Sequence, residues 1–139
     1  MPTLDMDTIQ SYLDNSPFIH SCGMRVVAAD PEQESLTISM PFQAQFERGK
    51  DTGQIHGGPI AALIDTAGCF GLVMLLGSGV PTVNFHTDYL RPAVNRTSLR
   101  AVAQVRRVGR TVGVVDVDVY DDDGRLVAVG RGTFGSQSG

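Results

Sequence analysis

The 139 residues of this chain suit one folded domain and are enough to bury a sizeable core. Hydrophobic residues make up 42% and charged residues 19%, which excludes a largely disordered chain. The formal net charge of −4 argues against general nucleic-acid binding, because that function needs a basic surface. The first residues lack a signal region, and the two cysteines form no C-x-x-C pair. We therefore expect a reduced, cytoplasmic protein.

The first forty residues predict one short helix and two strands. Apolar side chains recur at helical spacing over residues 5–14, and the Asn-Ser-Pro sequence that follows ends this helix. Residues 1–16 are therefore an N-terminal helical segment. Strands are expected at 24–29 and 35–40, and the second alternates cleanly between apolar and polar side chains.

A long apolar helix is the central feature of the predicted fold. It follows a polar loop over 43–54, begins near Gly58 and ends near Leu76, where a Gly-Ser-Gly sequence stops it. Asp65, near its middle, argues against membrane insertion, since a carboxylate at mid-bilayer costs about 3 kcal/mol or more. A helix that is apolar nearly all round must instead be enclosed by the rest of a folded protein.

The second half of the chain carries only strand signals. Asp123-Gly124 marks a hairpin turn, and the tail over 135–139 is expected to fray. A curved antiparallel sheet that wraps the long helix would give an α+β domain over residues 1–139. The open side of the helix would need a second copy, so we expect a homo-oligomer, either a dimer or a dimer of dimers. The four strands are expected at 80–90, 99–106, 115–120 and 126–134.

The junction between the polar loop and the long helix carries the first chemical signal. Gly57 and Gly58 stand there, directly after His56, and Pro59 suits the first helical turn. Amide N–H groups at a helix start have no partner inside the helix, so they form a site for negative charge. Such donors could polarise a thioester carbonyl, and one donor can contribute roughly 3 kcal/mol.

Asp65 carries the second signal, because an ionised carboxylate in an apolar helix needs a reason. A structural role, as a cap or as a partner for an arginine, is one reading. The functional reading makes Asp65 a general base that activates water, or a nucleophile that attacks directly, at a thioester held by the N–H of Gly57.

The ordered set of motifs resembles the hotdog-fold thioesterase superfamily, in its phenylacetate-degradation-type acyl-CoA thioesterase branch. That branch has H-G-G, an acid seven residues past the second glycine, and then a strand that ends in Y-[L/M]-x-P. Here these are His56-Gly57-Gly58, Asp65 and Tyr89-Leu90-Arg91-Pro92. Gly109-Arg110-Thr111 and the segment 123–128 also match, and the resemblance covers residues 15–134.

The resemblance implies an acyl-CoA thioesterase that needs no cofactor and no metal. It assigns carbonyl polarisation to the N–H of Gly57 and places Asp65 across a dimer interface from it. Thr82 would position the water or the carboxylate, and His56 would shape the loop. Where the family often has Asn or Gln, this chain has Lys50, which donates hydrogen bonds but accepts none.

Several residues are candidates for contact with the substrate. Cys69 lies one helical turn past Asp65, where a related branch has threonine, and a small buried thiol is the alternative reading. Arginine forks suit the phosphates of CoA. The predicted catalytic residues are Asp65, Gly57, His56 and Thr82. The predicted substrate-binding residues are Gly58, Lys50, Cys69, Arg91, Arg107 and Arg110.

Two alternative functions stay open on the sequence. Lys50 in place of the usual amide is compatible with a non-catalytic acyl-CoA-binding protein. A hotdog hydratase or dehydratase is the other alternative, although His56 directly precedes the helix and the H-F-P pattern of such relatives does not occur here.

Overall fold

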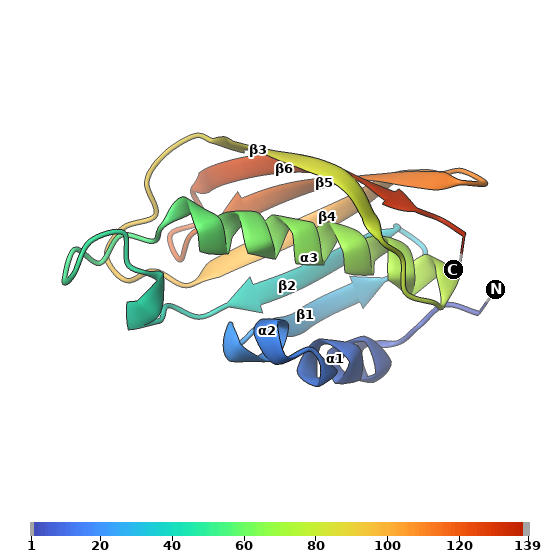
Figure 1. The fold of residues 1–139 in the computed structure, drawn as a ribbon, viewed down its shortest axis with the longest axis horizontal. Helices are drawn as coiled ribbons and strands as arrows, with labels where there is room; N and C mark the ends of the chain where they lie inside the picture. The colour runs from blue at the N-terminus through green and yellow to red at the C-terminus, as the bar shows by residue number, and fades with distance from the viewer. Residues whose placement is uncertain (1, 138–139) are drawn as a thin grey trace.

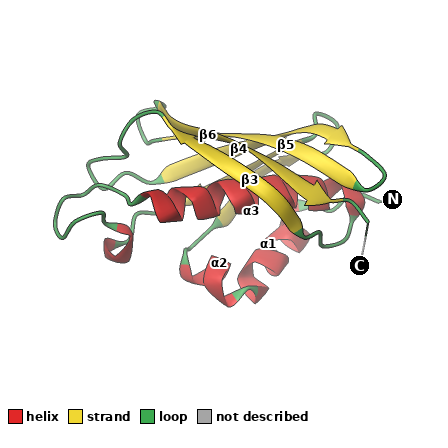
Figure 2. Ribbon diagram, turned by 45° about the horizontal axis from the view of Figure 1, so that its top comes forward, coloured by secondary structure: helices red, strands yellow, loops and turns green. Residues whose placement is uncertain are grey.

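A six-stranded antiparallel sheet lies across one long helix, α3 (Gly57–Leu76), in the computed structural model, which describes residues 2–137 (Figure 1). The sheet twists as it crosses the helix, so that the strands cover one side of α3 and leave the other side open (Figure 2). The predicted α+β arrangement around a central helix is confirmed. In sheet order the strands are β1 (Arg25–Asp30), β2 (Ser35–Met40), β4 (Leu99–Val108), β5 (Val112–Tyr120), β6 (Leu126–Gly135) and β3 (Thr82–Tyr89).

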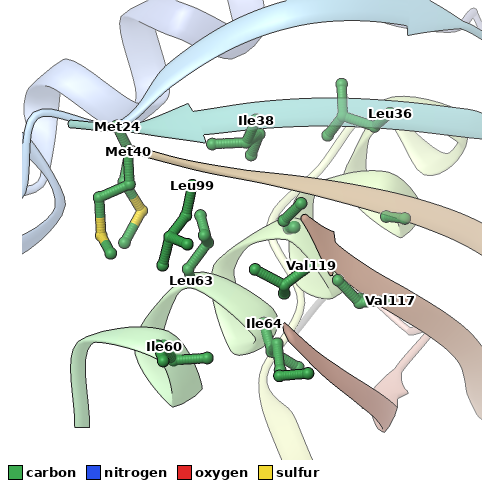
Figure 3. Close-up of a cluster of buried hydrophobic side chains, with 14 of the residues drawn as sticks. Met24, Leu36, Ile38, Met40, Ile60, Leu63, Ile64, Leu99, Val117 and Val119 are labelled. Atoms are coloured by element: carbon green, nitrogen blue, oxygen red, sulfur yellow. The ribbon is translucent and has the colours of Figure 1, made fainter. Parts of the chain in front are cut away.

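The core lies between the sheet and α3, because every second strand residue points toward the helix. Along β4 and β5, buried side chains alternate with less buried ones, as the sequence predicts. The first turns of α3 contribute Ile60, Leu63 and Ile64, which meet side chains of β2, β4 and β5 (Figure 3). The strand side chains in this contact include Ile38, Met40, Leu99, Val117 and Val119.

Glycine on β6 lets α3 approach the sheet closely. A Cβ atom at Gly130 would lie 2.6 Å from Cγ2 of Ile64 and 2.7 Å from the backbone oxygen of His86. By length and apolar composition α3 would also suit a membrane span. In this fold, however, ten of its twenty residues are buried.

The N-terminal segment forms two helices where the sequence predicted one. Helix α1 (Met6–Asn15) ends where expected, but α2 (Pro17–Ser21) follows at once. Ser16 caps α2 by accepting a hydrogen bond from the N–H of Ile19, and Pro17 occupies the first helical position. Proline therefore ends one helix and starts the next, because its fixed φ suits the first turn and its missing N–H costs nothing there.

The end of the chain is also more ordered than predicted. Strand β6 includes Gly135, and the N–H of Ser136 donates to the carbonyl oxygen of Thr111 at 2.9 Å. Residues 135 and 136 are thus ordered, contrary to the predicted fraying of 135–139, and residues 138–139 lie outside the described part of the chain.

The two edges of the sheet differ in how they are covered. At β1, the side chain of Gln10 on α1 accepts a 2.7 Å hydrogen bond from the N–H of Val26 and donates to the oxygen of Met24, which blunts that edge. At the opposite edge, β3 pairs with β6 on one side only, and the apolar side chains of Val83 and Phe85 are exposed. An edge of this kind is a ready template for another strand.

We predict that Gly130→Ala destabilises the fold by about 1–3 kcal/mol, because the added methyl group must displace the backbone of β3 as well as Ile64. Thermal unfolding would show a lower midpoint. Gly79→Ala is the control, since its Cβ would meet no atom within 4 Å. Equal midpoints for the two variants would contradict this account of the packing.

Candidate active site

The start of α3 leaves one backbone donor free. Four N–H groups at a helix start lack a partner within the helix, here those of residues 56–59. The N–H of His56 donates to the oxygen of Phe46 at 2.7 Å, and the N–H of Gly58 donates to Nδ1 of His56 at 3.2 Å. Proline at 59 has no N–H. Within residues 2–137, the amide of Gly57 is therefore the unpaired donor of this turn, at the positive end of the helix dipole.

His56 acts as the N-cap of α3, and this contact explains its place before the glycines. Its Nδ1 accepts the bond from Gly58, so a neutral ring carries its proton on Nε2. This contact is structural, and a direct role of His56 in catalysis stays a prediction. A Cβ at Gly58 would meet Nδ1 of His56 at 3.8 Å and no other atom of the described chain within 4 Å, so the space above this glycine is open.

Tyr89 lies against Gly57 from the end of β3. Its hydroxyl donates a 2.7 Å hydrogen bond to the carbonyl oxygen of Gly57. A Cβ at Gly57 would lie 3.0 Å from that hydroxyl oxygen and 3.1 Å from Cζ of the ring. A side chain at position 57 would therefore require the tyrosine ring to move by a few tenths of an ångström.

Asp65 and Thr82 meet where β3 begins. The hydroxyl of Thr82 donates to Oδ1 of Asp65 at 2.9 Å, a pair that the sequence prediction placed together. The carboxyl group is half-buried on α3 and lies beside the uncovered edge of the sheet. One carboxylate oxygen is thus held, and Oδ2 has no hydrogen-bond partner among the described residues.

Cys69 stands one turn further along α3, and its Sγ donates to the oxygen of Val80 at 3.6 Å. Burial, reinforced by the charge of Asp65, raises the pKa of the Cys69 thiol to about 12. The thiol therefore stays protonated at neutral pH, and a thiolate nucleophile is disfavoured. Its position beside Asp65 is as predicted, while its contact with substrate stays a prediction.

One chain places the two halves of the predicted site apart. Gly57 and Asp65 are eight residues apart on one helix, which separates them by about 12 Å along its axis. A thioester carbonyl within hydrogen-bond reach of the Gly57 amide is therefore out of reach of the carboxylate of the same chain. Within one chain, the described residues therefore do not form a complete site around a thioester.

A pocket of about 380 Å³ opens beside Gly57. Arg91, a predicted substrate-binding residue, lines it together with Arg48, which the sequence analysis did not single out. Both guanidinium groups are exposed, and neither forms an ion pair with the rest of the described chain. Apolar side chains such as Ile60 and Leu90 form other parts of the lining.

The remaining candidates are not brought to this pocket within one chain. Arg107 and Arg110 lie at the hairpin between β4 and β5, whose Gly113 packs on Leu72 near the other end of α3. Along the helix that is about 22 Å from Gly57. Lys50 lies exposed in the loop before α3, and no contact joins it to Asp65.

Two residues of the site escaped the sequence analysis for different reasons. Tyr89 belonged to the recognised strand-end motif, but only the fold shows that its hydroxyl reaches Gly57. Arg48 sits in a polar loop, where a single arginine gives no signal of its own. Among residues 2–137 there is no group of three or more His, Cys, Asp or Glu side chains that could hold a metal ion.

An antiparallel sheet that curves across one long central helix is the hotdog architecture, and comparison with known families agrees. The model of the Thioesterase superfamily matches residues 52–128, more than half of the chain, so this protein belongs to that superfamily. A solved structure described as a thioesterase-superfamily protein superposes with a TM-score of 0.87 at 29% identity, covering 94% of this chain and 96% of the other.

Among characterised relatives, the chain is PaaI-like. It is 28% identical to the acyl-coenzyme A thioesterase PaaI of Escherichia coli over 122 residues, which is 86% of this chain and 81% of PaaI. A protein of Halobacterium salinarum that is provisionally named an esterase is 36% identical over 137 residues, covering 91% of this chain and 88% of its own length. Membership of this group makes the protein a hydrolase of the thioesterase and esterase class.

The raised pKa of Cys69 predicts a difference in alkaline stability. The folded protein holds the thiol proton more tightly than the unfolded chain, whose thiol has a pKa near 9.0. The contribution of Cys69 to stability is therefore complete below pH 9 and declines as the pH rises toward 12. Between pH 8 and pH 10, we expect the wild type to lose about 1 kcal/mol more than Cys69→Ala. Parallel pH profiles of unfolding for both proteins would refute this.

Proposed function

We propose that this protein hydrolyses an acyl-CoA thioester to the free acid and CoA, in a site that two subunits share. The observation that carries the proposal is that one fold presents both a free amide at the start of α3 and a carboxylate beside an open sheet edge. Each is half of a hydrolytic site, since one can stabilise an oxyanion and the other can activate the attacking group.

The open strand β3 supplies a way to join the halves. Its first residue, Thr82, holds Asp65, and its last residue, Tyr89, holds Gly57. A twofold axis that pairs β3 with its copy in antiparallel fashion brings the start of one strand opposite the end of the other. The Asp65 carboxylate of one subunit then faces the Gly57 amide of its partner. This argument supports the dimer that the sequence predicted.

The chemistry follows from the residues that meet there. Asp65 takes a proton from a water molecule that attacks the carbonyl carbon, or its free oxygen attacks that carbon directly. The N–H of Gly57 and the helix dipole stabilise the oxyanion, and the tetrahedral intermediate then expels the thiolate of CoA. After direct attack, a water molecule hydrolyses the mixed anhydride on Asp65, which releases the free acid and restores the carboxylate. Thr82 holds one carboxylate oxygen and so orients the other toward the carbonyl.

The pocket beside Gly57 supports CoA as the leaving group. Arg48 and Arg91 are unpaired cations in its lining and suit a phosphate, because a guanidinium group can form two parallel hydrogen bonds to it. The named activity of the relative PaaI, an acyl-coenzyme A thioesterase, supports the same class of substrate.

Replacement of the carboxylate tests the chemistry. We expect Asp65→Asn to lower kcat for thiol release from acyl-CoA by about 100-fold or more, because the amide keeps the size of the side chain but cannot act as a base. Asp123→Asn is the matched control, since Asp123 is an exposed acid in the turn between β5 and β6.

Because the acyl group is unknown, the assay uses a panel of aliphatic and aromatic acyl-CoA substrates. The release of free thiol is measured for each substrate. Equal rates for wild type and Asp65→Asn would remove Asp65 from the mechanism. Tight binding of acyl-CoA without turnover by the wild type would instead favour the non-catalytic alternative.

Charge on the open edge tests the shared site. We expect Phe85→Lys to yield monomers and to abolish hydrolysis, because the middle of β3 lies beside the proposed twofold axis, where a lysine meets its own copy. Val27→Lys is the control, since it places the same charge on the other edge strand at another exposed apolar residue, 49% against 37%. Light scattering after size exclusion gives the oligomeric state. A fully active Phe85→Lys monomer would contradict a site built from two subunits.

A further inference from the structure

The peptide group between Gly57 and Gly58 is held at both of its polar ends. Its carbonyl oxygen accepts the 2.7 Å hydrogen bond from the hydroxyl of Tyr89, and its N–H donates to Nδ1 of His56 at 3.2 Å. The preceding backbone is also fixed, since the N–H groups of Ile55 and His56 donate to carbonyl oxygens outside the helix. The free amide of Gly57 therefore lies between two anchored segments.

The ring of Tyr89 lies close to the place where a side chain at position 57 would begin. The φ angle of Gly57 is not in the left-handed region, so the backbone there would accept other residues. The obstacle is the ring of Tyr89, whose hydroxyl oxygen and Cζ would lie 3.0 and 3.1 Å from a Cβ atom. Glycine at 57 and tyrosine at 89 thus form a fitted pair at the start of α3.

Tyr89 is 53% exposed, so the fold gains little core from its ring. An exposed hydroxyl that loses its protein partner can bond to water instead, with little change in the free energy of folding. The bond from Tyr89 to the carbonyl oxygen of Gly57 therefore mainly sets the orientation of that peptide group. The donors of an oxyanion site work because they are oriented before the reaction, and a displacement of about 1 Å can cost roughly 100-fold in rate.

We propose that Tyr89 is a positioning residue that aims the N–H of Gly57 at the substrate carbonyl by holding the Gly57–Gly58 peptide. The inference rests on the proposed thioesterase function. It also gives β3 two tasks, because Thr82 at its other end orients Asp65. In the proposed dimer, each β3 strand then orients the Asp65 carboxylate of one site and the Gly57 N–H of the other site.

Tyr89→Phe tests the proposal, because it keeps the ring against Gly57 and removes only the hydroxyl. We expect kcat for acyl-CoA hydrolysis to fall by about 5- to 30-fold while KM stays within about twofold, since the lost orientation acts on the oxyanion and not on binding. The thermal midpoint and the dimer should be unchanged. Tyr12→Phe, the same change at an exposed tyrosine on α1, should match the wild type.

A spectroscopic measurement separates orientation from a general structural effect. The carbonyl stretch of an acyl-CoA bound to Asp65→Asn should move to lower frequency than in water, because the amide polarises the bond. In the double variant Asp65→Asn with Tyr89→Phe, we expect this shift to shrink. An unchanged kcat in Tyr89→Phe, a change confined to KM, or an equal carbonyl shift in both proteins would each overturn the inference.

The same measurements distinguish this inference from the proposed function. If the wild type hydrolyses acyl-CoA and Asp65→Asn does not, but Tyr89→Phe equals the wild type, the function stands and the role of Tyr89 falls. If the wild type binds acyl-CoA without turnover, the carbonyl shift alone decides whether Tyr89 aims the amide. If it neither binds nor hydrolyses acyl-CoA, both proposals fall together.

Discussion

The arrangement of α3 is the constraint on which the rest of the protein depends. One helix carries both the free amide of Gly57 and the carboxylate of Asp65, and its rise keeps them about 12 Å apart. A single chain therefore holds two halves of the proposed site but cannot close one around a thioester. This spacing is the reason for proposing a site that two subunits share across an open sheet edge.

Strand β3 is the element that could join the two halves of the proposed site. In the described chain it pairs with another strand on one side only. One of its ends contacts Asp65 through Thr82, and the other contacts Gly57 through Tyr89. Evolution usually blunts an open edge, as α1 does here with the side chain of Gln10 beside β1. The contrast between the two edges makes β3 the natural surface for a second copy.

The hydrogen bonds at the start of α3 determine which backbone N–H is free to bind a substrate. Three of the four positions that lack helical partners are satisfied or have no N–H, through Phe46, His56 and proline. The donor that remains belongs to Gly57, and the helix dipole adds to its pull on an oxyanion. The buried thiol of Cys69, by contrast, stays protonated beside the carboxylate and adds no second nucleophile.

The sequence by itself determined the α+β class, the long helix, the alternating strands and the family, because periodicity and ordered motifs are local properties. It also placed Asp65 beside Thr82. The tertiary structure decided the rest, because contacts between distant segments leave no local pattern. Only folding brings Tyr89 onto Gly57, lines one pocket with Arg48 and Arg91, and carries Arg107 and Arg110 to the far end of α3.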